Sequence, residues 1–327
     1  MIRAAIIGLG WWGRVMVESV QLKSSKLRFT CGATLDRATV EQFARDRGIL
    51  LFDSLQDVLG RPDIDAVFLA TPHSLHLPQI LECASVGKPV FSEKPLALTL
   101  HDAKVAINAC EKAAVSLGLG TDRRMLPAMM RLKQLVEEGQ LGTILHIEGQ
   151  YSNDFMSRAI SGSWRSSEQE APGAGMPGPG LHVLDAMIHL AGPMTTIRGQ
   201  VSRPRGRRVP VDAVSLLVSF ATGATGTLGC VRGVPNYFRL AAFGTNGWAE
   251  LRQFGDLEVA LSGRQAWSER YPSELAVGPL LESFADSIVG LAAFPVSTHS
   301  MLQTVAAFET AIAALENSGL LKVPEIV

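Results

Sequence analysis

The chain has 327 residues, of which 47% are hydrophobic and 19% are charged, and its formal net charge is −1. This length predicts two domains, and the apolar content excludes a disordered chain. The near-zero charge argues against nucleic acid as a partner, because binding to phosphates needs a strongly basic protein.

The sequence has no apolar run of the roughly 18 residues that span a bilayer. A strand-like run begins directly after Met1, Ile2 and Arg3, which leaves no room for a signal peptide. The four cysteines lack the C-x-x-C spacing of a zinc site and do not form a disulfide framework. We therefore expect a cytoplasmic protein that does not associate with membranes.

The first predicted element is the apolar run from Ala4 to Ile7, which leads into GLGWWG and then into a helical pattern. This order predicts strand, turn and helix. In such a turn Gly8 permits the tight bend, Gly10 lets the backbone approach a pyrophosphate, and Gly13 allows close packing of the helix. The turn thus indicates a dinucleotide site, with an ordinary glycine-rich turn as the alternative. Trp11 and Trp12 either line the nicotinamide side of the pocket or pack on a partner segment.

The second predicted strand, Leu27 to Leu35, ends at Asp36. A carboxylate at this place accepts hydrogen bonds from both hydroxyls of an adenosine ribose; its alternative role is a helix cap. Arg37 is suited to a 2′-phosphate, but Asp36 would repel that phosphate. We therefore predict NAD in preference to NADP.

Further apolar strands are predicted at 49–52, 66–70, 89–91 and 115–119, and they alternate with helical segments. This is the pattern of a doubly wound parallel sheet. Ligands of such sheets bind outside the carboxyl ends of the strands. Two polar motifs follow these ends, Thr71-Pro72-His73-Ser74-Leu75-His76 and Ser92-Glu93-Lys94-Pro95.

The pattern changes after about residue 194. Alternating runs predict strands of an antiparallel sheet at 213–220, 226–231, 237–243 and 248–251. Helical segments follow near 279–290 and 298–317. A second domain is therefore expected.

Seven motifs along nearly the whole chain resemble those of the Gfo/Idh/MocA oxidoreductases: GLGWWG, TLD, ATPHSLH, SEKPLALT, RR followed by Pro127, WR at Trp164-Arg165, and GLHVLD. The resemblance implies an α/β fold with a Rossmann domain at 1–122. It implies a substrate-binding and oligomerisation domain at 123–327, which contains a large, mainly antiparallel open sheet. A C-terminal helix is expected to pack back on the first domain, and subunits are expected to form a dimer or tetramer through the open sheet.

The same resemblance implies hydride transfer between a nicotinamide cofactor and a secondary alcohol of a sugar, cyclitol or related cyclic polyol. Lys94 matches the family lysine that touches the reacting hydroxyl, and His182 matches the family histidine that exchanges its proton. An ammonium stabilises a developing alkoxide, and an imidazole takes a proton near neutral pH. The alternative for His182 is a histidine of a partly buried helix. The Lys94-Pro95 peptide is expected to be cis.

The resemblance and the turn together give a set of expected cofactor-binding residues. They are, in chain order, Gly8, Gly10, Trp11, Trp12, Gly13, Asp36, Arg37, Thr71, Pro72, His76, Glu93 (beside the nicotinamide ribose), Lys94, Arg124 and the Trp164-Arg165 pair.

The chain departs from the family pattern at Gly178, where an Asp often stands four residues before the histidine. Either Asp185 takes part of that role or the substrate differs from a polyol. The Asn153-Asp154-Phe155 segment is similar to the branch that oxidises a ring cis-dihydrodiol, as in phthalate dihydrodiol dehydrogenases. A non-catalytic NAD-binding regulator and an NAD-dependent glycosidase are the further alternatives.

Three residues of the predicted helix, His182, Asp185 and His189, share one face because they stand at i, i+3 and i+7. The outer two are about 10 Å apart along the axis at 1.5 Å per residue. We therefore expect no metal site.

Overall fold

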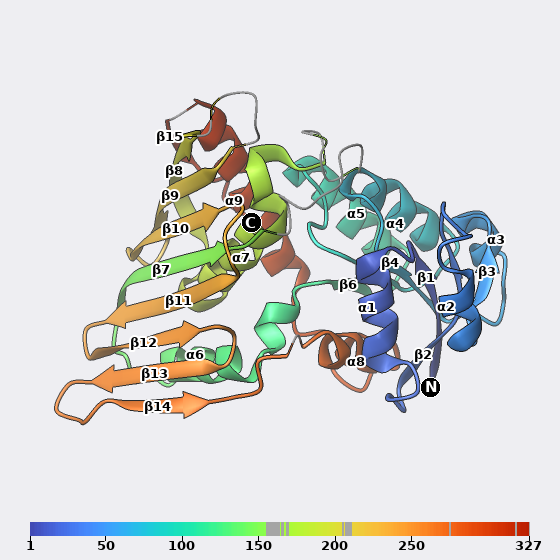
Figure 1. Cartoon of the computed structure of the whole chain (residues 1–327), viewed down its shortest axis with the longest axis horizontal. Helices are drawn as coiled ribbons and strands as arrows, with labels where there is room; N and C mark the ends of the chain where they lie inside the picture. Colours follow the sequence, from blue (N-terminus) through green and yellow to red (C-terminus); the bar gives the residue numbers. More distant parts are fainter. Residues whose placement is uncertain are drawn as a thin grey trace. The chain divides into compact units, whose positions relative to one another are not determined.

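The computed structural model describes residues 1–154, 164, 167, 170–204, 206, 211–274, 276–317 and 319–326 (Figure 1). The chain divides into two compact units: the first comprises Met1–Thr121 and Ala276–Met301, and the second comprises Asp122–Leu275 and Leu302–Val327. The predicted division into domains at 1–122 and 123–327, with a C-terminal helix packed back on the first domain, stays a prediction. None of the described helices combines the length and the apolar character that crossing a bilayer requires.

The first unit is built on a six-stranded parallel sheet. Its strands lie in the order β3 (Leu50–Phe52), β2 (Leu27–Ala33), β1 (Ile2–Ile7), β4 (Ala66–Leu69), β5 (Val90–Ser92) and β6 (Leu117–Leu119). This is the order of a dinucleotide-binding sheet, in which the crevice lies where the strand order reverses, between β1 and β4.

Helices connect these strands, and their ends follow local sequence signals. They are α1 (Trp11–Val20), α2 (Glu41–Asp46), α3 (Leu55–Leu59), α4 (His76–Ser85) and α5 (Leu100–Lys112), with a short 3₁₀ turn η1 (His73–Leu75) before α4. Ser54 caps α3 by accepting from the backbone of Asp57, and Thr99 caps α5 by accepting from Asp102. Such caps satisfy amides that the helix itself leaves unbonded.

The core of the first unit contains a cluster of aromatic rings. Phe68 of β4 stacks on Phe91 of β5 at 5.3 Å between ring centroids, and Phe284 meets both rings edge-on at 5.6 Å. Phe284 belongs to α8 (Val277–Ile288), which lies late in the chain but within this unit. Buried aromatic rings supply large apolar area and favour such offset and edge-to-face arrangements.

The second unit is built on a nine-stranded sheet. Its strands lie in the order β14 (Trp267–Arg270), β13 (Asp256–Leu261), β12 (Gly247–Arg252), β11 (Tyr237–Gly244), β7 (Ile144–Ser152), β10 (Thr225–Val231), β9 (Ala213–Phe220), β8 (Met194–Ser202) and β15 (Leu320–Lys322). Only the β7–β10 pair is parallel among the pairings described.

Helices pack on one face of this sheet, and glycines stand in the strands where the helices come closest. The helical elements of the unit are η2 (Asp122–Met125), α6 (Pro127–Glu137), η5 (Pro172–Gly175), the turn η6 (Met176–Gly180), α7 (Leu181–Ala191) and α9 (Thr298–Asn317), which begins in the first unit. A Cβ on Gly149 of β7 would lie 2.3 Å from Val183 of α7, and one on Gly199 of β8 would lie 2.8 Å from the α9 backbone. Glycine is therefore needed where α7 and α9 approach the strands.

The structure confirms the predicted fold class, an α/β protein with a doubly wound parallel sheet and a large, mainly antiparallel sheet. The predicted strand at 213–220 coincides with β9, and the predicted helix at 298–317 coincides with α9. The prediction did not include β7, β8, β13 or β14.

Candidate active site

The glycine-rich turn joins β1 to α1 in the first unit. Gly8 has a φ of +93°, and a Cβ on it would lie 2.6 Å from the carbonyl oxygen of Ala70. A Cβ on Gly13 would lie 2.0 Å from the carbonyl oxygen of Gly8. Both positions therefore exclude a side chain, for the conformational and packing reasons expected of this turn.

Gly10 differs, because a Cβ there would meet nothing within 4 Å. Gly10 is also the N-cap of α1, with no side-chain cap bond and no acidic residue in the first turn. An open backbone at an uncapped helix N-terminus suits the pyrophosphate of a dinucleotide. The residues present therefore fit the predicted cofactor.

The two tryptophans differ in exposure. Trp11 is 57% exposed, whereas Trp12 is half-buried and its indole Nε1 has no acceptor among the described residues. Their ring centroids are 5.3 Å apart. Contact of either ring with a nicotinamide stays a prediction.

Asp36 and Arg37 follow β2 and are both exposed. Nη1 of Arg37 lies 3.0 Å from Oδ1 of Asp53. The guanidinium thus has a carboxylate partner outside the predicted ribose site, while contact of Asp36 with a ribose stays a prediction.

The motifs after β4 and β5 are linked through a buried histidine. Nδ1 of His76 lies 2.7 Å from the carbonyl oxygen of Pro95, and Nε2 lies 3.1 Å from that of Thr71. The hydroxyl of Thr71 donates to Gln79 over 2.6 Å. The ring of His76 therefore ties the two strand-end loops together, and Pro72 stands in the same loop as Thr71.

Glu93 and Lys94 follow β5 directly. The predicted cis peptide at Lys94-Pro95 is confirmed. The buried carboxylate of Glu93 lies over Gly120, where a Cβ would come within 2.4 Å of Oε1, and its Oε2 accepts from the amide of Lys94 over 3.2 Å. Lys94 itself is half-buried at the carboxyl end of the sheet.

A second group of predicted residues lies in the second unit, where η2 contacts α7. Arg124 is buried, and its guanidinium makes a two-bond contact with Asp185 of α7, at 2.8 and 2.6 Å. The hydroxyl of Thr304 donates to the same carboxylate over 3.0 Å. Burial opposes the charge of Arg124, but the attraction and hydrogen bonds of Asp185 outweigh it and raise the pKa of Arg124.

His182 lies on α7 and is 8% exposed. Its Nδ1 is 3.9 Å from Oδ1 of Asp122, a buried carboxylate of η2 that also pairs with Arg123. Asp122 is not among the predicted site residues, and Arg123 is predicted only as part of the RR motif. The signal available was the charged run Asp122-Arg123-Arg124 at the end of a predicted strand.

The turn before α7 contains Gly178, at the position where a family carboxylate was expected. Nothing lies within 4 Å of the place of its Cβ, and its neighbours Met176, Pro177 and Pro179 are buried. Residue 178 therefore supplies no carboxylate, and the described side chains beside it in the turn are apolar.

His189 lies two turns further along α7. Burial, reinforced by the positive charges of Arg124 and Lys133, lowers the pKa of His189 to about 4. Within the described part of the chain no three His, Cys, Asp or Glu side chains are grouped as ligands for a metal ion.

Trp164 is half-buried, and Arg165 and Phe155 lie outside the described residues.

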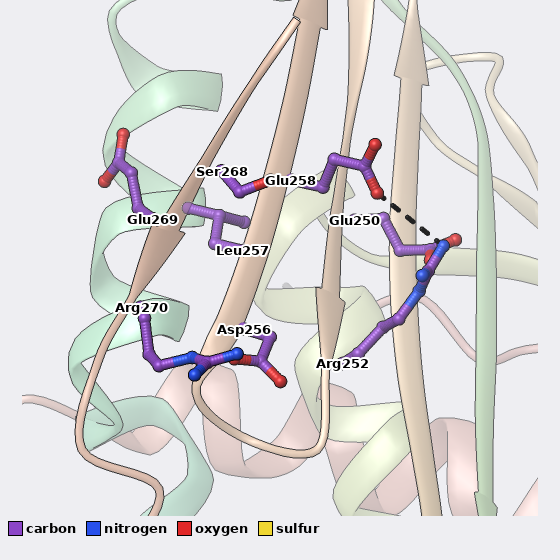
Figure 2. Close-up of a pocket in the computed structure, with 8 residues that line it drawn as sticks. All are labelled: Glu250, Arg252, Asp256, Leu257, Glu258, Ser268, Glu269 and Arg270. Carbon is purple, nitrogen blue, oxygen red and sulfur yellow. Dashed lines mark hydrogen bonds and ion pairs between the residues drawn. The ribbon is translucent and has the colours of Figure 1, made fainter.

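An open pocket of 520 Å³ lies over β12, β13 and β14 (Figure 2) and contains no predicted site residue. Figure 2 shows Glu250, Arg252 and Glu258 gathered on one side of the strands, where Arg252 and Glu258 pair at 3.8 Å. Arg270 donates to Asp256 over 2.9 Å. The lining has four acids and two arginines, and two of the acids, Glu250 and Glu269, also pair with Arg239 and Arg131 outside the pocket.

Two family models match the chain. The model described as an oxidoreductase family with an NAD-binding Rossmann fold matches residues 2–121, and the GFO/IDH/MocA C-terminal domain matches residues 129–250. Together they match more than half of the chain.

Similar proteins with known names include two dehydrogenases. Levoglucosan dehydrogenase of Pseudarthrobacter phenanthrenivorans is 28% identical over 64% of this chain and 62% of its own length. The scyllo-inositol 2-dehydrogenase (NAD(+)) of Bacillus subtilis is 32% identical over 45% of this chain and 44% of its own length. These matches span less than two thirds of either relative.

The fold is also similar to that of solved structures. A levoglucosan dehydrogenase in complex with NADH and L-sorbose has a TM-score of 0.89 and 21% sequence identity, and the match covers 99% of each chain. At this identity the likeness shows the fold.

Proposed function

This chain belongs to the GFO/IDH/MocA family of oxidoreductases and carries its NAD-binding Rossmann domain, and we propose that it is a dehydrogenase acting on CH–OH groups. The substrate is a secondary alcohol, or the matching ketone, of a sugar, cyclitol or related cyclic polyol. The open backbone at Gly10, at the N-terminus of α1, carries the proposal. The names of the levoglucosan and scyllo-inositol dehydrogenases support the substrate class.

The first unit supplies the residues that would hold the cofactor. The amides at the start of α1 bind the pyrophosphate, and Asp36 binds the adenosine ribose. Glu93, whose carboxylate lies over Gly120, would bind beside the nicotinamide ribose. Bound NAD would supply the acceptor for the hydride of the carbon that bears the hydroxyl.

Two side chains act on the reacting hydroxyl in this proposal. Lys94 places an ammonium near the oxygen and stabilises the negative charge that develops as the proton leaves. His182 takes that proton as a general base. The pKa of His189 is lowered to about 4, which makes His189 a weak base, so we assign the proton transfer to His182.

Gly178 supports an alternative substrate, a cis-diol on a carbocyclic ring. The open space at Gly178 and its apolar neighbours offer no carboxylate to a polyol hydroxyl. Fewer polar partners favour a substrate with fewer hydroxyl groups, because unpaired hydroxyls lose hydrogen bonds to water.

A substrate screen tests the proposal. The protein is incubated with NAD and with inositols, anhydrosugars, aldoses and cyclic cis-diols, and NADH absorbance is followed. We expect turnover with one cyclic class, and Lys94→Ala is expected to lower it by about 10² or more while NADH affinity changes by only a few fold. The exposed Lys104→Ala is the matched control.

Three outcomes separate the alternatives. NADH binding without turnover of any class would identify a regulator. Release of a glycosidic leaving group with no net NADH would identify a glycosidase. Near-normal turnover in Lys94→Ala would overturn the role of Lys94.

We further propose that the protein is a homo-oligomer, a dimer or tetramer, whose subunits meet through the nine-stranded sheet. Register supports this proposal, because it places Leu217, which is 59% exposed, on the face opposite the buried Leu216 and Val218. Exposed apolar residues on a regular surface suit an interface between copies.

A further inference from the structure

The end of β6 leads into a buried carboxylate that stands beside the candidate base. Asp122 is 1% exposed, and its Oδ1 lies 3.9 Å from Nδ1 of His182, itself 8% exposed. The two residues are sixty positions apart in the sequence, so the contact between η2 and α7 is what brings them together. In a buried setting, charges at this separation interact more strongly than in water.

The orientation of Asp122 is fixed by Arg123. Oδ2 of Asp122 pairs with Nη1 of Arg123. The Arg123 guanidinium lies over the rings of Phe254 at 4.8 Å and Tyr151 at 5.9 Å, and the Tyr151 ring lies 6.2 Å from that of His182. Arg123 thus holds one oxygen of the carboxylate, and the other oxygen is the one that lies 3.9 Å from Nδ1 of His182.

Asp185, the other buried acid near this histidine, has a different role. Its Oδ1 accepts from Arg124 and Thr304, and its Oδ2 accepts a second bond from Arg124. Both oxygens are therefore engaged in holding η2, α7 and α9 together. The alternative that Asp185 takes part of the role of the missing family carboxylate stays a prediction.

We infer that Asp122 is the positioning residue of His182 and takes the place of the carboxylate that is missing at Gly178. Oδ1 of Asp122 lies 3.9 Å from Nδ1, beyond hydrogen-bond distance, so the carboxylate acts as a buried negative charge that stabilises the imidazolium formed when the ring takes a proton. The part of this inference that concerns substrate rests on the proposed function.

Several other charged or polar side chains contribute to the electrostatic field at His182. In the described part of this unit they are Arg123 and Arg124 from η2, Tyr151 from β7, and Asp185 and His189 from its own helix. Arg124 and Asp185 compensate each other. Arg123 opposes the effect of Asp122, so the two neighbours are expected to shift the titration of His182 in opposite directions.

Histidine NMR of the full-length apoprotein measures this coupling without any substrate. The His182 signal is assigned by its loss in His182→Gln and is then titrated with pH. Asp122→Asn is expected to lower the apparent pKa of His182 by about one pH unit, the smaller end of the effect of a close opposite charge. Arg123→Gln is expected to raise it, and Asp122→Glu is expected to keep it close to that of the unmodified protein.

A double variant removes the remaining ambiguity, since Asp122→Asn alone leaves the Arg123 guanidinium without its carboxylate. The decisive comparison is therefore Arg123→Gln with and without Asp122→Asn. A lower pKa in the double variant supports the inference. An unchanged His182 titration in that background overturns it and makes Asp122 only the partner of Arg123.

Folding is checked by near-ultraviolet circular dichroism. Should the Asp122→Asn variants fail to fold, Asp122→Ser removes the same charge with a smaller polar side chain, and an unchanged pKa of His182 in that variant would overturn the inference. Once a substrate is known, the kcat/KM profile is expected to shift with the NMR value. If Asp122 changes the pKa of His182 but the kcat/KM of His182→Ala keeps its pH dependence, the proposed role of His182 fails. The coupling between Asp122 and His182 then stands.

Discussion

Asp36 carries the cofactor preference at the scale of a single side chain. Its neighbour Arg37 pairs with Asp53, but both partners of this ion pair are largely exposed, and such pairs contribute little. The pair therefore does not by itself exclude a 2′-phosphate. The preference must come from the negative charge of Asp36, which accepts from a ribose diol and repels a phosphate.

We therefore expect NADH to bind more tightly than NADPH in a calorimetric titration. Asp36→Ala is expected to weaken NADH binding by about tenfold, or about 1.4 kcal/mol, and to leave NADPH binding equal or tighter. Asp53→Asn is the control and is expected to change neither affinity by more than a few fold. Tighter binding of NADPH to the unmodified protein would mean that Arg37 dominates.

The local sequence predicts the residues that would bind the cofactor better than it predicts the residue pairs around His182. The glycines at 8, 10 and 13 are consecutive in one turn, so the local sequence contains the whole feature. The pairs Asp122–His182 and Arg124–Asp185 join residues about sixty positions apart. No local pattern encodes which of two acids, Asp122 or Asp185, faces the histidine, because the packing of η2 on α7 decides it.

At the scale of elements, α7 contains a half-buried histidine, His189, that resists protonation. Burial and two nearby cations hold the pKa of His189 at about 4 in the folded protein, against about 6.5 in an unfolded chain. Between these values the unfolded state binds more protons, so folding stability rises with pH through this window and is lost as pH falls.

We expect His189→Gln to flatten this dependence between about pH 6.5 and 4. Across this window His189 changes the free energy of unfolding by up to about 3 kcal/mol. Urea unfolding at several pH values measures this change. The exposed His101→Gln on α5 is the control and should keep the slope of the unmodified protein. An unchanged slope in His189→Gln would assign the acid sensitivity to other groups.

Elements with regular alternation are predictable from the sequence, and those without it are not. In β9, buried and exposed residues alternate along most of the strand, and its predicted bounds are confirmed. The strand β7 contains Gly149, placed there because α7 packs closely on the sheet. That glycine weakens the local strand signal, and its reason lies in a helix that comes more than thirty residues later.

At the scale of the whole molecule, the nine-stranded sheet has a second face, opposite the one on which α7 and α9 pack close to Gly149 and Gly199. Register places Glu148, Arg239 and Glu250 on this face, with Arg239 pairing to Glu148 at 2.7 Å. Glu250 is buried and also pairs with Arg252. The acids and arginines of adjacent strands thus compensate one another, so the face carries little unpaired charge that would repel a second copy.

Light scattering on the protein as it elutes from a size-exclusion column measures its molar mass and so tests the proposed oligomer. We expect the mass of a dimer or tetramer, and we expect Leu217→Lys to shift it towards the monomer, because two-fold symmetry places each substituted residue in the interface twice and a buried unpaired ammonium is costly. Leu291→Lys is the matched control, since Leu291 is 72% exposed but belongs to the first unit. A monomeric unmodified protein would overturn the proposal, and an unchanged oligomer in Leu217→Lys would move the interface away from β9.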